Sequence, residues 1–224
     1  MGGHEIERPG KDLVQRVRIV ACGMIAREVI AVRQLAGLEH IELTCLPAEW
    51  HFTPDRIAAG VEKAVAEARA EGVDDILVGY ADCGTGGQLD DVCDRLDVQR
   101  IAGPHCFAFY QGLENYDHGR DLAAFYVTDF LARQPDAFLY RPLGIDRHPE
   151  LIPTYFGAYE SVVYLAQTDD PALTKAAKSI AERLGLPFER RFTGYGDLLG
   201  AIAGFGRHAP TGTNGRVEAS GLTS

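Results

Sequence analysis

The chain has 224 residues and an ordinary composition for a soluble globular protein, with 46% hydrophobic and 24% charged residues. Its formal net charge is −10, from 32 acidic and 22 basic residues, and no cluster of lysine and arginine occurs. Nucleic-acid binders generally carry a basic face, so nucleic acid is not expected as a partner. A small metabolite or another protein is the expected partner. No run approaches the roughly 18–20 apolar residues of a membrane span, and the N-terminus lacks the apolar centre of a secretory signal. These features predict a cytoplasmic protein without a membrane partner.

In the first half of the chain, short apolar runs alternate with helical patterns. The runs VRIVAC (17–22), IELTCLP (41–47), DDILVGY (74–80) and QRIAG (99–103) are typical of buried strands. Helices are predicted over about 25–36, from about Thr53 to the C-cap Gly72, and after Gly87. Strands alternating with helices indicate parallel pairing, and therefore an α/β fold built from Rossmann-like units.

The second half predicts a less regular middle segment and a second, smaller α/β lobe. Residues 111–160 are rich in Phe and Tyr and are expected to form an aromatic helical insert. Residues 161–205 repeat the strand and helix pattern, with a strand at 161–166, a helix from Pro171 to Gly185, a strand near 187–192 and a last helix. The predicted organisation is thus a disordered N-terminus (1–15), a first lobe (16–110), the insert, the second lobe and a disordered tail (206–224).

Three of the five cysteines occupy positions that favour chemistry. Cys45 lies inside a predicted strand and Cys93 on a predicted helix, and both are expected to be small buried hydrophobes. Cys22 and Cys83 instead end predicted strands, and Cys106 follows the next one. The carboxyl ends of parallel strands share one edge of a sheet, so these three thiols are expected to meet there. Each is also close to a predicted helix N-terminus, which would lower its thiol pKa.

Three thiolates at one edge would repel one another, and a bound cation or cluster would relieve that repulsion. The favoured interpretation is a metal centre held by Cys22, Cys83 and Cys106 with one open position. A [4Fe–4S] cluster is the first choice and zinc the second. Reactive thiols without a metal, and purely structural cysteines, are the alternatives.

Other polar residues near the same predicted edge suggest roles around such a centre. His51, Asp82 and His105 are candidates for proton transfer, each against a structural role in packing or in a turn. Gly84, Thr85, Gly86 and Gly87 are predicted to form an anion-binding nest for a substrate carboxylate or phosphate. Arg147 and His148 are predicted to contact the substrate from a later loop.

Seven blocks together resemble a family catalogued as domain of unknown function 1638, over about residues 17–200: CGMIAREV, LPAEWHFTP, YADCGTGGQLD, RIAGPHCFAFYQG, FYVTDFLA, LGIDRHPEL and YLAQTDD. Ala81 and Ala108 depart from the usual family residues, and Ala108 removes a carboxylate. The resemblance implies that Cys22, Cys83 and Cys106 match shared cysteines, and it implies a genomic setting near corrinoid-dependent methyltransferases. In outline the layout also looks like quinolinate synthase, in which α/β units each offer a cysteine to one iron–sulfur cluster.

The resulting hypothesis is a metalloenzyme, a lyase or transferase, that acts on a small anionic metabolite. The resemblance places it in one-carbon or methylamine metabolism, with a corrinoid protein or methyltransferase as a partner, or a second copy of the chain. Two alternatives stay open. One is a cofactor-independent, racemase-like or lyase-like enzyme that uses Cys83 and Cys106 as acid and base. The other is a non-catalytic accessory protein that handles a corrinoid or a metal.

Overall fold

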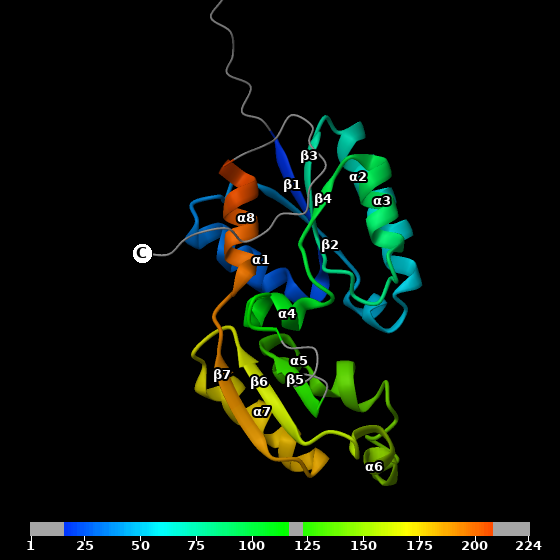
Figure 1. Cartoon of the computed structure of the whole chain (residues 1–224), viewed down its shortest axis with the longest axis vertical. Helices are drawn as coiled ribbons and strands as arrows, with labels where there is room; N and C mark the ends of the chain where they lie inside the picture. Colours follow the sequence, from blue (N-terminus) through cyan, green and yellow to red (C-terminus); the bar gives the residue numbers. More distant parts are fainter. Residues whose placement is uncertain (1–15, 117–122, 208–224) are drawn as a thin grey trace, which may run out of the picture.

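The computed structural model describes residues 16–116 and 123–207, which form two parallel α/β lobes stacked end to end (Figure 1). The predicted disordered N-terminus (1–15) and most of the predicted disordered tail (206–224) lie outside the described residues. The α/β fold predicted from the alternating pattern is confirmed by two sheets whose strand pairs, in the described residues, are parallel.

The first lobe is a four-stranded sheet with the order β2-β1-β3-β4. Its strands are β1 (Val17–Cys22), β2 (Glu42–Leu46), β3 (Asp75–Gly79) and β4 (Gln99–Arg100). Its helices are η1 (Gly23–Ile25), α1 (Ala26–Leu35), η2 (Ala48–Phe52), α2 (Asp55–Ala70), α3 (Gln88–Leu96) and α4 (Cys106–Gln111). Each predicted strand of this lobe is present, although β4 is shorter than the run 99–103.

The second lobe is a three-stranded sheet with the order β5-β6-β7. Its strands are β5 (Ala124–Thr128), β6 (Ser161–Ala166) and β7 (Phe188–Phe192). Its helices are α5 (Asp129–Arg133), the π-helix η4 (Asp136–Tyr140), η5 (Pro149–Leu151), α6 (Ile152–Phe156) and α7 (Pro171–Leu184). The chain then returns to the first lobe as α8 (Asp197–Arg207).

Two corrections to the predicted boundaries follow. The segment 111–160 is not purely helical, because residues 124–128 form β5 and pair with β6. The sequence AFYVT is aromatic and β-branched, which suits a strand that is buried on one face.

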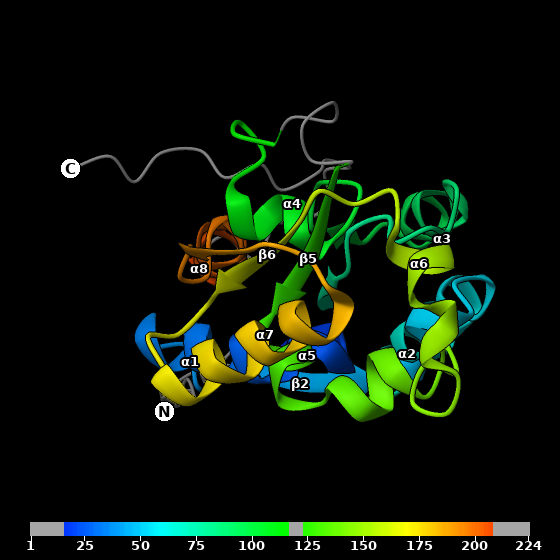
Figure 2. The same ribbon diagram turned by 90° about the horizontal axis from the view of Figure 1, so that it is seen from below.

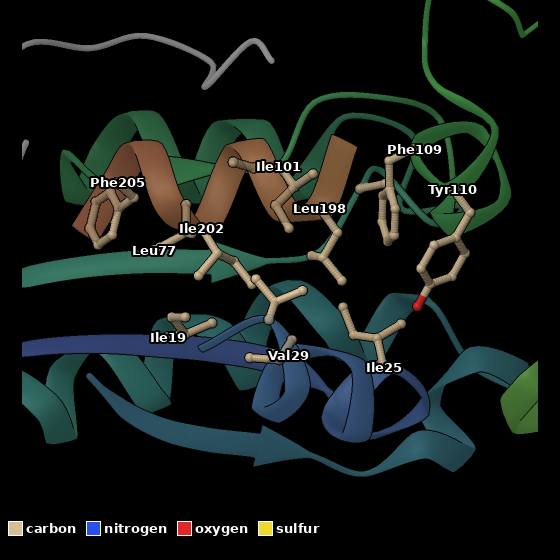
Figure 3. Close-up of a cluster of buried hydrophobic side chains, with 14 of the residues drawn as sticks. Ile19, Ile25, Val29, Leu77, Ile101, Phe109, Tyr110, Leu198, Ile202 and Phe205 are labelled. Carbon is tan, nitrogen blue, oxygen red and sulfur yellow. The ribbon is translucent and has the colours of Figure 1, made fainter. Parts of the chain in front are cut away.

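The second correction concerns α8, which was predicted as part of the second lobe but packs against α1 of the first. Leu198, Ile202 and Phe205 of α8 point toward the β1 and β3 side chains (Figure 3).

Helices cover both faces of the first sheet. On one face, Ile19 and Leu77 pack with α1 and α8 (Figure 3), and on the other, Val20 and Val78 pack with α2 and α3. Helix α2 shows why the elements form where they do. Its buried residues Ile57, Val61, Val65 and Ala68 follow the helical period, so one stripe of the helix faces the sheet.

The two lobes share one hydrophobic core rather than meeting across solvent. In the second lobe, α5 and α7 cover one face of the sheet, and α4 lies on the other side (Figure 2). Tyr126, Val163 and Leu165 on that side belong to the same buried cluster as Ile19 and Leu77 of the first lobe. The carboxyl ends of the strands in both sheets therefore face the junction between the lobes.

A buried polar cluster crosses this junction. Glu28 of α1 is 4% exposed and forms an ion pair with Arg133 of α5, with 3.5 Å between Oε1 and Nη1. Burial raises the pKa of Glu28. Asp129, which is fully buried, accepts hydrogen bonds from the Tyr164 hydroxyl (2.7 Å) and the Gln167 amide N–H (3.0 Å). The ion pair joins α1 to the second lobe, while Oε2 of Glu28 is buried without a hydrogen-bond partner among the described residues.

Candidate functional site

A cavity of about 230 Å³ lies beyond the carboxyl ends of β1 and β3, on the side that faces the second lobe. It is lined by Cys22, Met24, Ile25, His51, Gly79, Tyr80, Ala81, Cys83, Gly84, Pro104, His105, Cys106, Phe107 and Phe109. All three predicted cysteines are in this lining. The predicted convergence of Cys22, Cys83 and Cys106 on one edge of the sheet is therefore present in the structure.

The ends of neighbouring strands and the loops after them place the three thiols. Cys22 is the last residue of β1 and caps η1, where its Sγ accepts a hydrogen bond from the Met24 amide at 3.5 Å. Cys83 follows β3, and Cys106 is the first residue of α4. The loops of Cys83 and Cys106 are joined by a backbone hydrogen bond from the Cys83 amide to the Pro104 carbonyl, at 2.8 Å. This bond fixes the two cysteine loops relative to each other.

Cys83 has a strained backbone. Its φ is +52°, in the left-handed region that L residues other than Asn and Asp seldom adopt. Non-glycine residues held in this conformation are concentrated at functional sites. The flanking Gly84 also has a positive φ, of +81°, so the chain turns sharply here and brings the Cys83 side chain to the cavity.

Burial raises the pKa of all three thiols. The pKa of Cys83 rises to about 12, and those of Cys22 and Cys106 are also raised, with desolvation as the largest cause in each case. Negative charge on one thiol further raises the pKa of its neighbours. The prediction that helix N-termini would lower these pKa values is wrong, because α4 and η1 are short and the cost of burying a charge is larger. The free protein therefore holds neutral thiols at neutral pH.

Two histidines line the cavity as predicted. His51 lies on η2, where its side chain is accessible to solvent and partial desolvation lowers its pKa. His105 precedes Cys106, and its Nε2 lies 3.0 Å from the Tyr116 hydroxyl. Imidazole exchanges protons near neutral pH, so both residues are chemically suited to proton transfer in this cavity.

Tyr80 is a cavity residue that the sequence analysis missed. It is 2% exposed, and its hydroxyl is buried without a hydrogen-bond partner of ordinary geometry among residues 16–116 and 123–207. The hydroxyl approaches the Cys22 thiol, and this contact lowers the pKa of Cys22. The register of the two predicted strands could have indicated that Tyr80 lies beside Cys22. Ala21 pairs with Gly79 in the parallel ladder, so Cys22 and Tyr80 are the next residues along and fall side by side.

The predicted anion nest is present, but it holds a group of the protein itself. The Asp82 carboxylate accepts hydrogen bonds from the Gly87 amide (3.0 Å) and the Thr85 hydroxyl (2.8 Å). Contacts with the Gly84 and Gly86 amides also lower the pKa of Asp82. Of the four predicted nest residues, only Gly84 lines the cavity.

This filled nest changes the roles predicted for Asp82 and for the substrate anion. An aspartate at the start of the turn reaches its own backbone amides without the entropy cost that a separate ligand would incur. Asp82 is thus an ionised turn residue, and it is not in the lining of the cavity. The proposed binding of a substrate anion by Thr85, Gly86 and Gly87 is not favoured by this arrangement.

Arg147 and His148 do not reach the cavity. Both lie in the second lobe and are exposed, with 77% and 59% of their side-chain areas accessible. Arg147 pairs with Asp146, and His148 Nδ1 lies 3.1 Å from the Glu150 carboxylate. Neither residue lines the cavity, and their contact with a substrate stays a prediction.

The two cysteines outside the cavity, Cys45 and Cys93, differ in their burial. Cys93 on α3 is buried, as predicted, and packs in the core between α2 and the sheet. Cys45 is exposed, and the prediction of burial was wrong. The reason is that β2 is an edge strand, so one side of it lacks a neighbour.

Within the described parts of the chain, no group of three or more His, Cys, Asp or Glu side chains is placed so that it could hold a metal ion. Three sulfurs bound tetrahedrally to one zinc at about 2.3 Å must approach to within about 3.8 Å of one another. The three cavity cysteines share one lining but are not gathered around a single point. Their chemistry suits soft metals, whereas their arrangement does not suit a single ion.

The comparisons with known proteins add a family and no activity. A search of curated proteins and a search of solved structures both returned no match. The outline similarity to quinolinate synthase finds no support in them. None of the helices in the described residues is both long and apolar enough to cross a membrane.

One family model matches residues 45–201, a region that contains Cys83 and Cys106 and begins after Cys22. The matched region runs from β2 into α8 and so includes parts of both lobes. The chain therefore belongs to the family described as protein of unknown function (DUF1638).

Proposed function

We propose that this protein is an enzyme whose cavity holds an iron–sulfur cluster through Cys22, Cys83 and Cys106, with one iron left for a substrate. The observation that carries the proposal is that three thiols, from the end of one strand and from two loops beside it, line one small and mainly apolar cavity. When bound, a [4Fe–4S] cluster of this kind would supply a Lewis acid at its open iron.

The state of the thiols supports a cationic occupant. Each thiol is neutral in the free protein because burial opposes its ionisation, and for Cys83 and Cys106 the neighbouring thiols would also repel the charge. A centre that carries positive iron compensates three thiolates at once, and its binding releases their protons. The same elevated pKa values disfavour the alternative of a metal-free enzyme with Cys83 or Cys106 as a base, because little thiolate would exist at pH 7.

Zinc is placed second, because no group of three or more His, Cys, Asp or Glu side chains in the described residues is placed to hold a single ion. In a cubane cluster each cysteine binds a different iron, so the three sulfurs stand further apart than around one ion. We therefore retain the cluster and place zinc second.

The residues that line the cavity also limit the size and charge of the substrate group that can enter it. Among the described residues, no lysine or arginine lines the cavity, and the nearby nest is filled by Asp82. We expect the part of the substrate that enters to be small and uncharged, and any anionic group to remain outside. His51 and His105 would exchange protons with it. One-carbon or methylamine metabolism, suggested by the family resemblance, is the proposed setting.

The first experiment is metal analysis of protein purified without oxygen. We expect roughly three to four irons per chain and the broad visible absorption of an iron–sulfur chromophore. Changing Cys22, Cys83 or Cys106 to serine should each remove most of the iron. The matched controls are Cys45→Ser and Cys93→Ala, which should retain it.

Three outcomes would separate the alternatives. Full iron binding by the three serine variants would contradict the assignment of the ligands. Activity in iron-free protein would support the cofactor-independent thiol enzyme instead. Iron-free and inactive protein that forms a stable complex with a corrinoid protein or methyltransferase would support the accessory role.

A further inference from the structure

We propose that residues 51–54 form a gate at the mouth of the cavity, and that stacking of Phe52 in the first lobe on Phe138 in the second holds this gate closed. Opening of the gate would admit the molecule or group that the cavity binds. The inference goes beyond the proposed function, because it depends on the cavity and not on the identity of its occupant.

The mouth of the cavity lies beside residues 51–54. Among the lining residues, His51 and Gly84 are exposed to solvent, and the others are buried or partly buried. The two exposed residues therefore mark where the cavity reaches solvent. Gly84 faces the proposed gate, because a Cβ added to it would lie 3.5 Å from Cγ of Pro54. Residues 51–54 thus form one wall of the entrance.

The ring of Phe52 joins this wall to the second lobe. It stacks on the ring of Phe138, with 6.1 Å between the ring centroids and 21° between the ring planes. Phe138 lies on the π-helix η4 and contacts Phe130 edge to face, at 4.7 Å between centroids. Phe52 also contacts His51 edge to face, at 5.7 Å. A continuous row of four rings therefore runs from the lining of the cavity into the second lobe.

The proposed gate is held loosely enough to open. His51, Phe52 and Thr53 are exposed, and Phe52 keeps 45% of its area accessible even in the stack. Segments with little buried apolar surface open locally at a low cost in free energy. The start of the segment is fixed instead, because the ring of Trp50 lies where a Cβ on Gly60 of α2 would be, at 2.1 Å. The chain beyond Trp50 can therefore swing while the rest of η2 stays in place.

The experiment measures access to the cavity in iron-free protein. N-ethylmaleimide, which is small and uncharged, modifies the cysteines at a fixed pH, and peptide mass spectrometry gives the rate at each one. Two cysteines outside the cavity serve as internal references. Cys45 is exposed and reports the reactivity of the reagent, and Cys93 is buried in the core of the first lobe and reports unfolding.

Loss of either ring of the stack should open the gate. In Phe52→Ala and in Phe138→Ala, the rates at the three cavity cysteines should rise by about two- to tenfold, because the aromatic pair no longer favours the closed state. The rates at Cys45 and Cys93 should stay as in wild type. The double variant should react no faster than the faster single variant, since both changes remove the same contact.

The matched control is Phe125→Ala. Phe125 packs in the core of the second lobe, with its ring against those of Phe156 and Tyr159 of the same lobe. Its loss should leave the rates at the cavity cysteines unchanged.

Four results would overturn the gate. They are cavity cysteines that react as fast as Cys45 in wild type, unchanged rates in Phe52→Ala and Phe138→Ala, an equal rise in Phe125→Ala, and a rise that Cys93 shares. The measurement uses iron-free protein, so failure of the gate leaves the proposed cluster standing. Failure of the cluster likewise leaves the gate standing.

Discussion

At the scale of single residues, Cys83 combines a cavity thiol with a backbone conformation that suits glycine. Its φ of +52° places the side chain toward the lining that it shares with Cys22 and Cys106. A residue with a Cβ is strained in this region, and glycine is not. Cys83 therefore carries its thiol at a position where the backbone conformation alone would favour glycine.

Replacing Cys83 by two residues that both lack the thiol should reveal this strain. We expect Cys83→Gly to be more stable than Cys83→Ala by about 1 kcal/mol, because only glycine relieves the left-handed conformation. Urea unfolding of the two iron-free variants measures the difference. Equal stability would show that the turn relaxes when the thiol is removed.

Asp82 gives a second residue-scale prediction, with a defined pH dependence. Hydrogen bonds from the turn lower the pKa of Asp82, so its contribution to stability is present above its unfolded pKa of about 3.9 and is lost as the pH falls through the folded value. Asp82→Asn should cost about 1 kcal/mol at pH 7, and the difference from wild type should vanish in acid.

Urea unfolding across this pH range tests the Asp82 prediction, with the exposed Asp74→Asn as the control. The control should differ little from wild type at pH 7. A difference for Asp82→Asn that persists unchanged in acid would mean that the amide disrupts the turn sterically, and that charge is not the cause.

At the scale of elements, the sequence predicted best where one local signal decides the structure. The run 161–166 is apolar, bounded by turn residues and buried in a sheet, and it forms β6 with the predicted bounds. Residues 124–128 were assigned to a helical insert, because their aromatic side chains suit either element and only pairing with β6 decides between them. The direction in which α8 folds back was likewise not encoded in its own amphipathic pattern.

The sequence predicted the candidate site about as well as it predicted the helices and strands. The positions of Cys22, Cys83 and Cys106 followed from the topology of parallel sheets, since strand ends share an edge. Their raised pKa values depend on burial, which a single sequence does not report. The Gly84–Gly87 turn was recognised, but whether a ligand or Asp82 fills it depends on a side-chain conformation.

Helix α8 should be essential to the first lobe although it comes last in the described chain. Ile202 is fully buried against α1 and the sheet (Figure 3), so Ile202→Ala should lower the free energy of unfolding by about 2–5 kcal/mol. Leu199→Ala on the same helix removes a side chain that is 36% exposed and should cost less than about 1 kcal/mol. Equal costs in chemical denaturation would contradict the observed packing of α8.

At the scale of the whole molecule, the lobe junction contains a carboxylate that burial makes costly. The pKa of Glu28 is raised above its unfolded value of about 4.3, so the folded state binds more protons. Its contribution to stability is present below that value and is lost as the pH rises through the folded pKa. The ion pair with Arg133 offsets only part of this cost, since the net shift is upward.

Glu28→Gln should therefore become progressively more favourable relative to wild type as the pH rises through this window. The measurement is urea unfolding of both proteins between roughly pH 4 and pH 8. The control is Glu62→Gln, because Arg95 lowers the pKa of Glu62 and any pH-dependent difference should appear on the acid side instead. A difference for Glu28→Gln that is constant with pH would contradict burial of an ionisable carboxyl at the junction.

The return of the chain as α8 has a consequence for how the protein could be divided. Cutting the gene between α4 and β5 would give one fragment with most of the first lobe and another with the second lobe and α8. Each fragment alone would leave the face joined by α1 and α8 uncovered. Co-expressed, the two pieces should reassemble without a covalent link, because α8 would again cover α1 and the first sheet, and the fold would then serve as a split-protein reporter.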